Sequence, residues 1–221
     1  MASPAEKKLS RIPLFPESGL SPEQQTVYDK IASGPRGGVV GPMRAALHSP
    51  ELADRWQALG EFLRYGSSLA PRLSELTILV CGRYWNSAVE WYVHAEVGRR
   101  VGISEAVIHA IRSAQPPAFQ REDEAAVYEY ARQMVEFGRV DDTIYQTIRA
   151  QMGAVGVVEL TALIGYYTMV AMTLNAHDVP PPDANPETLR VLDGEASAAD
   201  NRPTALPPST STPQAILSVK V

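Results

Sequence analysis

Apolar residues recur at helical spacing through most of the chain. In the segment 49–66, Leu52, Trp56 and Leu59 stand four and three positions apart, which places them on one face of a helix. The same spacing returns in later segments, and no alternation typical of paired strands occurs between them. The pattern therefore predicts an all-α fold, a bundle of roughly seven or eight helices.

Residues with capping chemistry mark the expected helix boundaries. Ser21 precedes Pro22, and Gln24 completes a capping box, so the first helix is expected to begin at residue 22. Asp141 has the position of a cap for the segment "DTIYQTIRAQMG", and the last long helix is expected at about 155–176. These signals divide the apolar pattern into separate helices.

Proline content and periodicity divide the chain into three parts. Residues 1–20 contain Pro4, Pro13 and Pro16 and no sustained periodicity, which predicts an N-terminal arm. Residues 21–178 carry the helical pattern and are expected to form one all-α domain. Residues 179–221 are rich in Pro, Ser and Ala and contain no aromatic residue, so they cannot bury enough apolar surface to offset their ordering entropy. This last part is expected to be an extended or disordered tail.

The amino-acid composition indicates a globular protein and argues against nucleic-acid and membrane partners. The chain has 221 residues, of which 45% are hydrophobic and 20% charged, values that are ordinary for a globular protein. Its net charge of −5 provides no basic surface, so no nucleic-acid partner is expected. The most apolar segment, 155–172, is interrupted by Glu159 and predicts a buried helix rather than a membrane span. The N-terminus has no apolar signal sequence, so we expect a cytoplasmic protein with no membrane partner.

Cys81 is the only cysteine of the chain, which excludes an intramolecular disulfide and a cysteine-based metal cluster. It follows the apolar run "TILV", where a lone cysteine is usually a small core residue. No second thiol is available to resolve a sulfenic acid. A redox role for Cys81 is therefore not expected.

The segment "SAVEWYVHAE" places ionisable groups inside an apolar helix. Ser87, Glu90, Trp91 and His94 are three or four positions apart and share one face. On a buried face, desolvation raises the pKa of a carboxyl group, and a nearby carboxylate stabilises a charged imidazole. Such a pair can exchange a proton near neutral pH, as general acid–base catalysis requires. On a solvated face the same pair would be an ordinary surface contact.

A metal site is another interpretation of these residues. Glu90 and His94 would need a third ligand, for which Glu75 and His177 are the candidates. No spacing known for a three-ligand site matches this set, so no metal is expected.

Other candidate polar residues lie in the loop "GPRGGVVGPMRAALHSP" and in the last helix. Guanidinium groups beside Gly-rich backbone suit the recognition of a carboxylate. Arg36 is interpreted as a surface residue of the loop, whereas for Arg44 the two interpretations stay open. Tyr166 and Tyr167 form a pair of a kind that more often belongs to a core than to a site.

The segment "LSELTILVCGRYWNSAVEWYVHAEVGRRVGIS" resembles the signature region of the carboxymuconolactone decarboxylase family, in the alkyl hydroperoxidase D-like superfamily. Glu75 matches the glutamate near the start of the first signature helix, and His94 matches the histidine that closes the signature. The resemblance covers about residues 45–178. It implies an all-helical, AhpD-like bundle that assembles as a homo-oligomer, a dimer, trimer or hexamer.

The peroxidase branch of that superfamily carries a Cys-x-x-Cys pair, which this chain lacks. When the signature is aligned on Glu75 and His94, Ser87 and Glu90 occupy the two cysteine positions. Thiol-based peroxide reduction needs one thiolate to attack and a second thiol to resolve. The segment "EWYVH" is instead similar to the Glu-aromatic-x-x-His form of the decarboxylase branch.

The resemblance implies a cofactor-independent, decarboxylase-like acid–base lyase that acts on a small aromatic-derived carboxylate or lactone. In this hypothesis His94 returns a proton to carbon, and Glu90 and Glu75 orient and tune its imidazole. The residues expected to bind the substrate are Arg44, Trp91, Ser87 and Tyr167. Two alternatives stay open: an alkyl hydroperoxidase-type antioxidant protein, disfavoured by the missing cysteines, and a non-catalytic helical oligomer whose Glu–His pair locks an interface.

Overall fold

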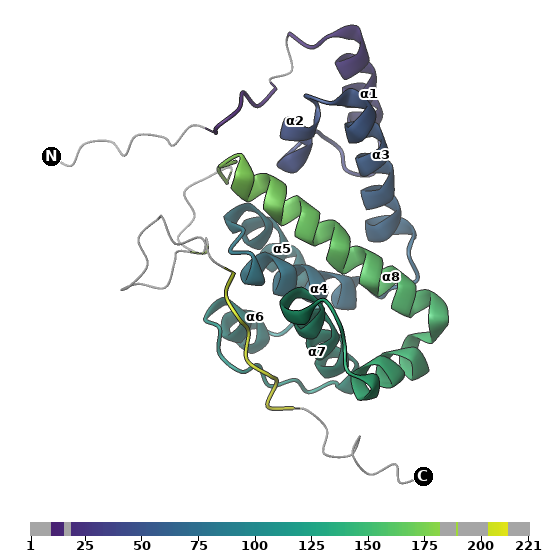
Figure 1. The fold of residues 1–221 in the computed structure, drawn as a ribbon, viewed down its shortest axis with the longest axis vertical. Coiled ribbons are helices and arrows are strands. Elements are labelled where there is room, and N and C mark those ends of the chain that lie inside the picture. The colour runs from purple at the N-terminus through teal and green to yellow at the C-terminus, as the bar shows by residue number, and fades with distance from the viewer. Residues whose placement is uncertain (1–9, 16–18, 182–188, 190–202, 212–221) are drawn as a thin grey trace, which may run out of the picture.

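The computed structural model describes residues 10–15, 19–181, 189 and 203–211 (Figure 1). Within these ranges the protein is helical and contains no strand, which confirms the predicted fold class. The elements are α1 (Pro22–Ser33), α2 (Pro42–Ala46), α3 (Pro50–Glu61), the π-helical turn η1 (Phe62–Gly66), α4 (Pro71–Tyr84), α5 (Ala88–Arg100), α6 (Glu105–Arg112), α7 (Glu122–Phe137) and α8 (Asp142–Ala176).

Local sequence signals explain where the first and the last helix begin. The capping box of α1 is formed, because the N–H of Gln24 donates to Oγ of Ser21 at 3.3 Å and the N–H of Ser21 donates to Oε1 of Gln24 at 2.9 Å. Asp141 accepts from the N–H of Ile144 at 2.9 Å and caps α8. Gly153, with φ of 68°, interrupts α8, so the two segments expected from the sequence form one kinked element.

Helix α4 is the centre of the helical core. It packs against α5, α7 and α8, and α7 packs against α8 as well. Its buried residues occupy every position from Leu73 to Arg83, so it is enclosed on all sides. Figure 1 shows α8 between a group formed by α1, α2 and α3 and a group formed by α4 to α7. The long helix therefore joins the two parts of the domain.

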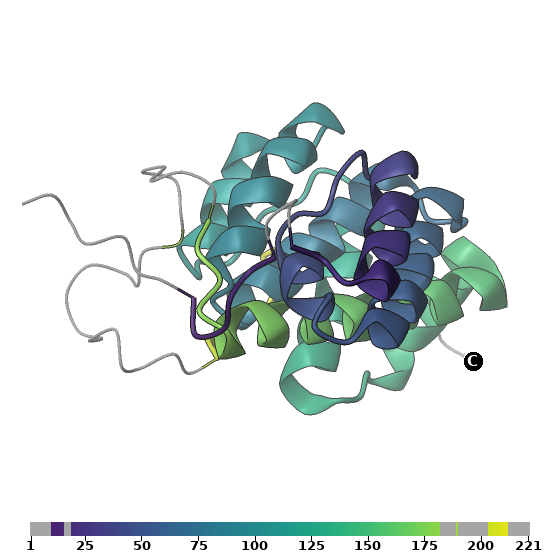
Figure 2. The same ribbon diagram turned by 90° about the horizontal axis from the view of Figure 1, so that it is seen from above.

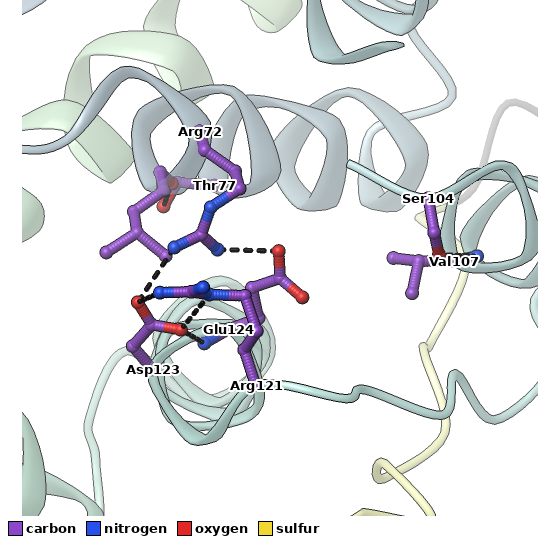
Figure 3. A network of polar contacts seen from close by, with 8 residues as sticks. Arg72, Thr77, Ser104, Val107, Arg121, Asp123 and Glu124 are labelled. Atoms are coloured by element: carbon purple, nitrogen blue, oxygen red, sulfur yellow. Dashed lines mark hydrogen bonds and ion pairs between the residues drawn. The ribbon is translucent and has the colours of Figure 1, made fainter. Parts of the chain in front are cut away.

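A cluster of charged side chains joins the beginnings of α4 and α7 (Figure 3). Arg72 on α4 donates to Oδ2 of Asp123 at 2.8 Å and to Oε1 of Glu124 at 2.5 Å. The side chains of Arg72 and Glu124 are largely buried, and Asp123 also pairs with Arg121 at 3.2 Å. Because both carboxylates lie in the first turn of α7, they also complement the positive end of its helix dipole.

Parts of the arm and of the tail lie on the helical domain. The guanidinium of Arg11 pairs with Asp178 at 2.7 Å, just after the end of α8. The segment 203–211 has no regular secondary structure and contacts the core, where the hydroxyl of Tyr128 donates to the carbonyl of Pro207 at 2.7 Å. The remaining parts of the arm and of the tail are outside the described residues.

Candidate active site

The hairpin of α4 and α5 carries the three expected catalytic residues. The helices are joined tightly, because the N–H of Ser87 donates to the carbonyl of Gly82 at 2.8 Å and Asn86 adopts a positive φ of 52°. The two helices also approach closely beside the join: a Cβ at Gly82 would lie 3.3 Å from Cβ of Glu90. The close approach fixes the position of Glu90 against α4.

His94 lies between two carboxylates. Its Nδ1 donates to Oε2 of Glu75 on α4 at 2.6 Å, and its Nε2 lies 3.4 Å from Oε2 of Glu90, one turn earlier on α5. All three residues are buried, with exposed fractions of 7% for Glu75, 5% for Glu90 and 3% for His94. The structure therefore brings the three predicted catalytic residues into one buried cluster.

A cavity of about 420 Å³ opens on this cluster. Glu90 and His94 line it, whereas Glu75 lies behind the imidazole and is not among the lining residues. Most of the other wall is apolar and comes from the loop before α2, from α2, from α5 and from α8. The volume suits a small organic molecule, and an apolar wall with few polar groups is typical of ligand sites.

Three arginines line the same cavity: Arg36, Arg44 and Arg64. Arg36 donates from Nη2 to the hydroxyl of Tyr166 at 3.1 Å, while its buried Nε has no hydrogen-bond partner within the described chain. Arg64 comes from η1, a π-helical turn of a kind often found at functional sites, and its guanidinium lies 5.2 Å from the centre of the Tyr65 ring. Within the described ranges, Arg64 makes no ion pair with a carboxylate.

Arg44, the arginine singled out in the sequence, has a different environment. Its Nε and Nη2 lie 3.5 Å from the carbonyl oxygens of Phe15 and Leu14, at the limit of a hydrogen bond. Phe15 also lines the cavity and packs against the ring of His48 with centroids 4.4 Å apart. Arg44 therefore contacts the N-terminal arm at the edge of the cavity as well as facing the cavity.

Burial controls the electrostatics of the cluster. It raises the pKa of the Glu90 carboxyl, although the neighbouring His94 and Arg64 act in the opposite direction. Burial also raises the pKa of Tyr167 well above its usual value, so this phenol stays neutral. Oε2 of Glu90 has no hydrogen-bond partner within the described chain. Glu90 is therefore a buried carboxyl group at the wall of the cavity, and its burial favours the protonated form.

The substrate-binding residues expected from the sequence fall into two sets. Arg44 and Tyr167 line the cavity, and the Tyr167 ring stands edge-on to the imidazole of His94, with centroids 5.2 Å apart and planes at 87°. Trp91 and Ser87 are not among the lining residues; both are buried, Trp91 in the hydrophobic core. Because these two side chains do not face the cavity, we assign no substrate contact to them.

Two solved structures have the same architecture. An alkylhydroperoxidase AhpD core, an uncharacterized peroxidase-related protein from Ralstonia eutropha JMP134, matches with a TM-score of 0.65 at 13% identity, over 80% of this chain and 94% of its own. An uncharacterized peroxidase-related protein from Silicibacter sp. TM1040 matches with a TM-score of 0.64 at 14% identity, over 85% and 97%.

The chain has the AhpD-like fold. At these identities the likeness establishes the fold alone and does not establish an activity. The sequence matches no protein-family model and no curated protein.

The single cysteine of this AhpD-like chain lies in the core. Cys81 is fully buried, and its Sγ lies 3.9 Å from the carbonyl oxygen of Ile164. Burial, with a further contribution from the charge of Glu90, raises the pKa of the thiol. A thiol in such a position is inert, because the thiolate is the reactive form.

The cluster does not have the arrangement of a metal site. Among the described residues, no group of three or more His, Cys, Asp or Glu side chains could hold a metal ion. His177, considered in the sequence as a further ligand, lies at the end of α8, where its carbonyl accepts from the N–H of Arg11 at 2.8 Å.

Proposed function

We propose that this protein is a cofactor-independent acid–base lyase, decarboxylase-like, for a small aromatic-derived carboxylate or lactone. The observation that carries the proposal is the position of His94, held by Glu75 on one side and facing Glu90 and a 420 Å³ cavity on the other. A buried proton donor beside an apolar cavity with cationic groups is suited to an anionic organic substrate. The fold and the segment "EWYVH" are compatible with this reaction.

Substrate binding is assigned to the arginines of the cavity. A carboxylate of the substrate accepts hydrogen bonds from the guanidinium groups of Arg64 and Arg36, which both line the cavity. The apolar wall contacts the carbon skeleton. The neutral Tyr167 phenol is one further candidate donor to the lactone carbonyl.

The chemical step exchanges carbon dioxide for a proton. The bond between the carboxylate carbon and the ring breaks, carbon dioxide leaves, and the electron pair of that bond is delocalised over the unsaturated lactone. Protonated Glu90 passes its proton to Nε2 of His94, the resulting imidazolium donates that proton to carbon, and Glu90 takes up one proton from water to complete the cycle. Glu75 holds Nδ1 of His94 so that Nε2 faces the reacting carbon.

Turnover of 4-carboxymuconolactone and related lactones, followed by loss of absorbance and release of carbon dioxide, tests the proposal. We expect activity in the wild type and a fall of about 10²- to 10⁴-fold in His94→Gln, the usual contribution of a general acid. His109→Ala is the matched control, because His109 is exposed on α6 and is not among the residues that line the cavity. It should retain full activity.

Two outcomes would contradict this assignment. Equal turnover in the wild type and in His94→Gln would exclude His94 as the proton donor. Absence of turnover for every lactone and carboxylate, together with a lower melting temperature of His94→Gln, would favour a non-catalytic role in which the Glu–His pair only stabilises the fold.

A peroxidase is the second candidate, favoured by one observation: both structural matches are named peroxidase-related. A thiol mechanism would depend on Cys81, which is buried and has a raised pKa. Peroxide consumption that is present in the wild type and lost in Cys81→Ser would support this candidate. We expect no such difference.

A further inference from the structure

The described part of the N-terminal arm, residues 10–15, lies at the end of α8. The backbone N–H of Arg11 donates to the carbonyl of His177 at 2.8 Å, and the guanidinium of Arg11 pairs with Asp178 at 2.7 Å. Figure 2 shows the arm, in purple, beside the yellow-green segment that follows α8. An arm without helical periodicity is therefore attached at one defined place on the helical domain.

A second set of contacts holds the arm against the connection between α2 and α3. Nε2 of His48 donates to the carbonyl of Pro13 at 2.8 Å, since a carbonyl oxygen can only accept. The ring of Phe15 packs on the imidazole of His48, with centroids 4.4 Å apart and planes at 47°. Because α2 and α8 both contribute to the wall of the cavity, the arm is tied to two sides of it.

Phe15 is the residue of the described arm that lines the cavity. Its side chain is half-buried and packs against the hydrophobic core. The contact with His48 holds the ring from one side, and the anchoring of Arg11 at the end of α8 holds the chain that carries it. The Phe15 ring is therefore a fixed part of the cavity wall, although it comes from a segment without regular secondary structure.

The charged groups of the cavity gather near the catalytic pair. Burial raises the pKa of Glu90, and Arg64 and Arg36 lie close enough to this carboxyl to oppose the shift. Arg36 also donates to the hydroxyl of Tyr166, whose ring packs against that of Tyr167 with centroids 5.4 Å apart. A substrate carboxylate bound by the two guanidinium groups therefore lies at this end of the cavity, which we call the charged end.

The cavity extends from the charged end toward the end of α8, where the arm is attached. Val179, which also lines the cavity, donates from its N–H to the carbonyl of Leu174 at 3.0 Å. Leu174 follows Tyr167 by seven residues, or about 10 Å along the helix axis. The wall beyond the charged end is apolar and includes Phe15 and Pro180. The arm therefore closes the part of the cavity that lies away from the arginines.

We propose that Phe15 determines the length of the acid that the site accepts. The inference rests on the proposed function, because it takes a carboxylate held by Arg64 and Arg36 as its fixed point. An acid with one ring fits between the charged end and Phe15, whereas the second ring of a longer acid meets the Phe15 ring. Packed side chains tolerate little added volume, so this contact weakens the binding of the longer acid. Phe15 takes no part in the transfer of the proton.

Calorimetric titration of the full chain with benzoate and with biphenyl-4-carboxylate tests the proposal, because binding is measured without any turnover. The wild type should bind benzoate about 10-fold or more tightly than biphenyl-4-carboxylate, the discrimination that a pocket achieves by its size. In Phe15→Ala this ratio should fall by about 10-fold or more, since the second ring gains room. In Phe15→Trp, which adds volume at the same place, the ratio should rise.

Two further variants serve as controls. Phe137→Ala makes the same change at the end of α7, at a residue that is 59% exposed and is not among those that line the cavity. It should leave both dissociation constants unchanged. Arg64→Met should weaken the binding of the two acids by the same factor, because it removes a contact to the carboxylate that both acids carry.

Three outcomes would overturn the proposal. The first is an unchanged ratio in Phe15→Ala. The second is a shift of the ratio in the same direction in Phe15→Ala and Phe15→Trp, which would make displacement of the arm, and not the size of the ring, the cause. The third is a wild type that binds neither acid at about 1 mM. The expected change of the ratio in a protein that turns over no lactone would contradict the lyase and still support the assignment of Phe15.

Discussion

The imidazole of His94 donates from Nδ1 to Oε2 of Glu75 over 2.6 Å, and the two residues belong to neighbouring helices of one hairpin. This contact selects the tautomer of the neutral imidazole, because a carboxylate can only accept. It also turns Nε2 toward Glu90 and the cavity. Glu75 is thus a positioning residue that acts through His94.

Glu75→Gln is expected to lower kcat on the order of 100-fold while KM changes little. An amide can occupy the same space, but it does not fix the proton on Nδ1 and does not stabilise an imidazolium. In proton NMR, the downfield signal of the Nδ1 proton should disappear in the variant. Glu96→Gln, an exposed change on the same helix as His94, is the control and should alter neither quantity.

A residue with only a structural role would give a different result for Glu75→Gln. In that case the loss of activity would follow the loss of folded protein, and the remaining folded fraction would turn over substrate at the wild-type rate. Active-site titration of the folded fraction distinguishes the two cases. An unchanged kcat per folded molecule would exclude a positioning role for Glu75.

Glu90→Gln is expected to make the protein more stable at pH 8 and less active. Burial raises the pKa of Glu90, so between the unfolded value of about 4.3 and the higher folded value the native state binds more protons than the unfolded state. The free energy of unfolding of the wild type therefore falls as the pH rises through this window, by at most about 1.4 kcal/mol for each pH unit. The neutral amide does not incur this loss.

Urea unfolding of the wild type and Glu90→Gln at pH 4, 6 and 8 measures the effect. The advantage of the variant should be largest at pH 8 and should shrink toward pH 4, where the wild-type carboxyl is largely protonated in both states. A variant that is less stable than the wild type at pH 8 would show that the ion pair with His94 outweighs the desolvation of the carboxylate.

Arg64→Met is expected to raise KM by about 10- to 100-fold, with a smaller effect on kcat. Arg64 faces the cavity without a carboxylate partner in the described chain, and a hydrogen bond to a charged group contributes about 1.5–3 kcal/mol. Arg55→Met, which removes an exposed arginine of α3 paired with Glu51, is the control and should leave KM unchanged.

Arg44→Met tests whether Arg44, expected from the sequence to bind the carboxylate, contributes as much to binding as Arg64. Arg44 lies 3.5 Å from carbonyl oxygens of the arm, so its loss should affect the position of Phe15 more than the binding of a carboxylate. We expect KM to rise less than in Arg64→Met. A larger rise in KM for Arg44→Met than for Arg64→Met, measured with the same substrate, would show that Arg44 binds the substrate carboxylate.

The helical fold and part of the site could be predicted because both depend on local periodicity. Glu90 and His94 are four residues apart, so helix geometry alone places them side by side. Glu75 is 19 residues away from His94, and in the sequence only the family resemblance connects them. The resemblance is informative because it reflects the packing of α4 on α5.

The rest of the site depends on contacts that no local pattern contains. Arg64 belongs to η1 and Arg36 to the loop after α1. Both line the cavity only because the tertiary fold brings these two segments together. One signal for Arg64 is present in the sequence, since it directly follows Phe62 and Leu63 at the end of an apolar helical pattern. Trp91 directly follows Glu90, and a rotation of about 100° per residue turns it into the core.

Gly60 on α3 is required by the pair of Arg36 and Tyr166. A Cβ at this position would lie 2.0 Å from the hydroxyl oxygen of Tyr166 and 2.2 Å from Nη2 of Arg36. Alanine favours a helix over glycine by about 1 kcal/mol, but the collision with a buried ring is expected to cost about 1–3 kcal/mol and to displace the guanidinium. Gly60→Ala should therefore lower the melting temperature and raise KM together. Gly38→Ala, where a Cβ meets nothing within 4 Å, should change neither; a raised KM in both variants would mean that the loop, and not the Arg36–Tyr166 contact, controls binding.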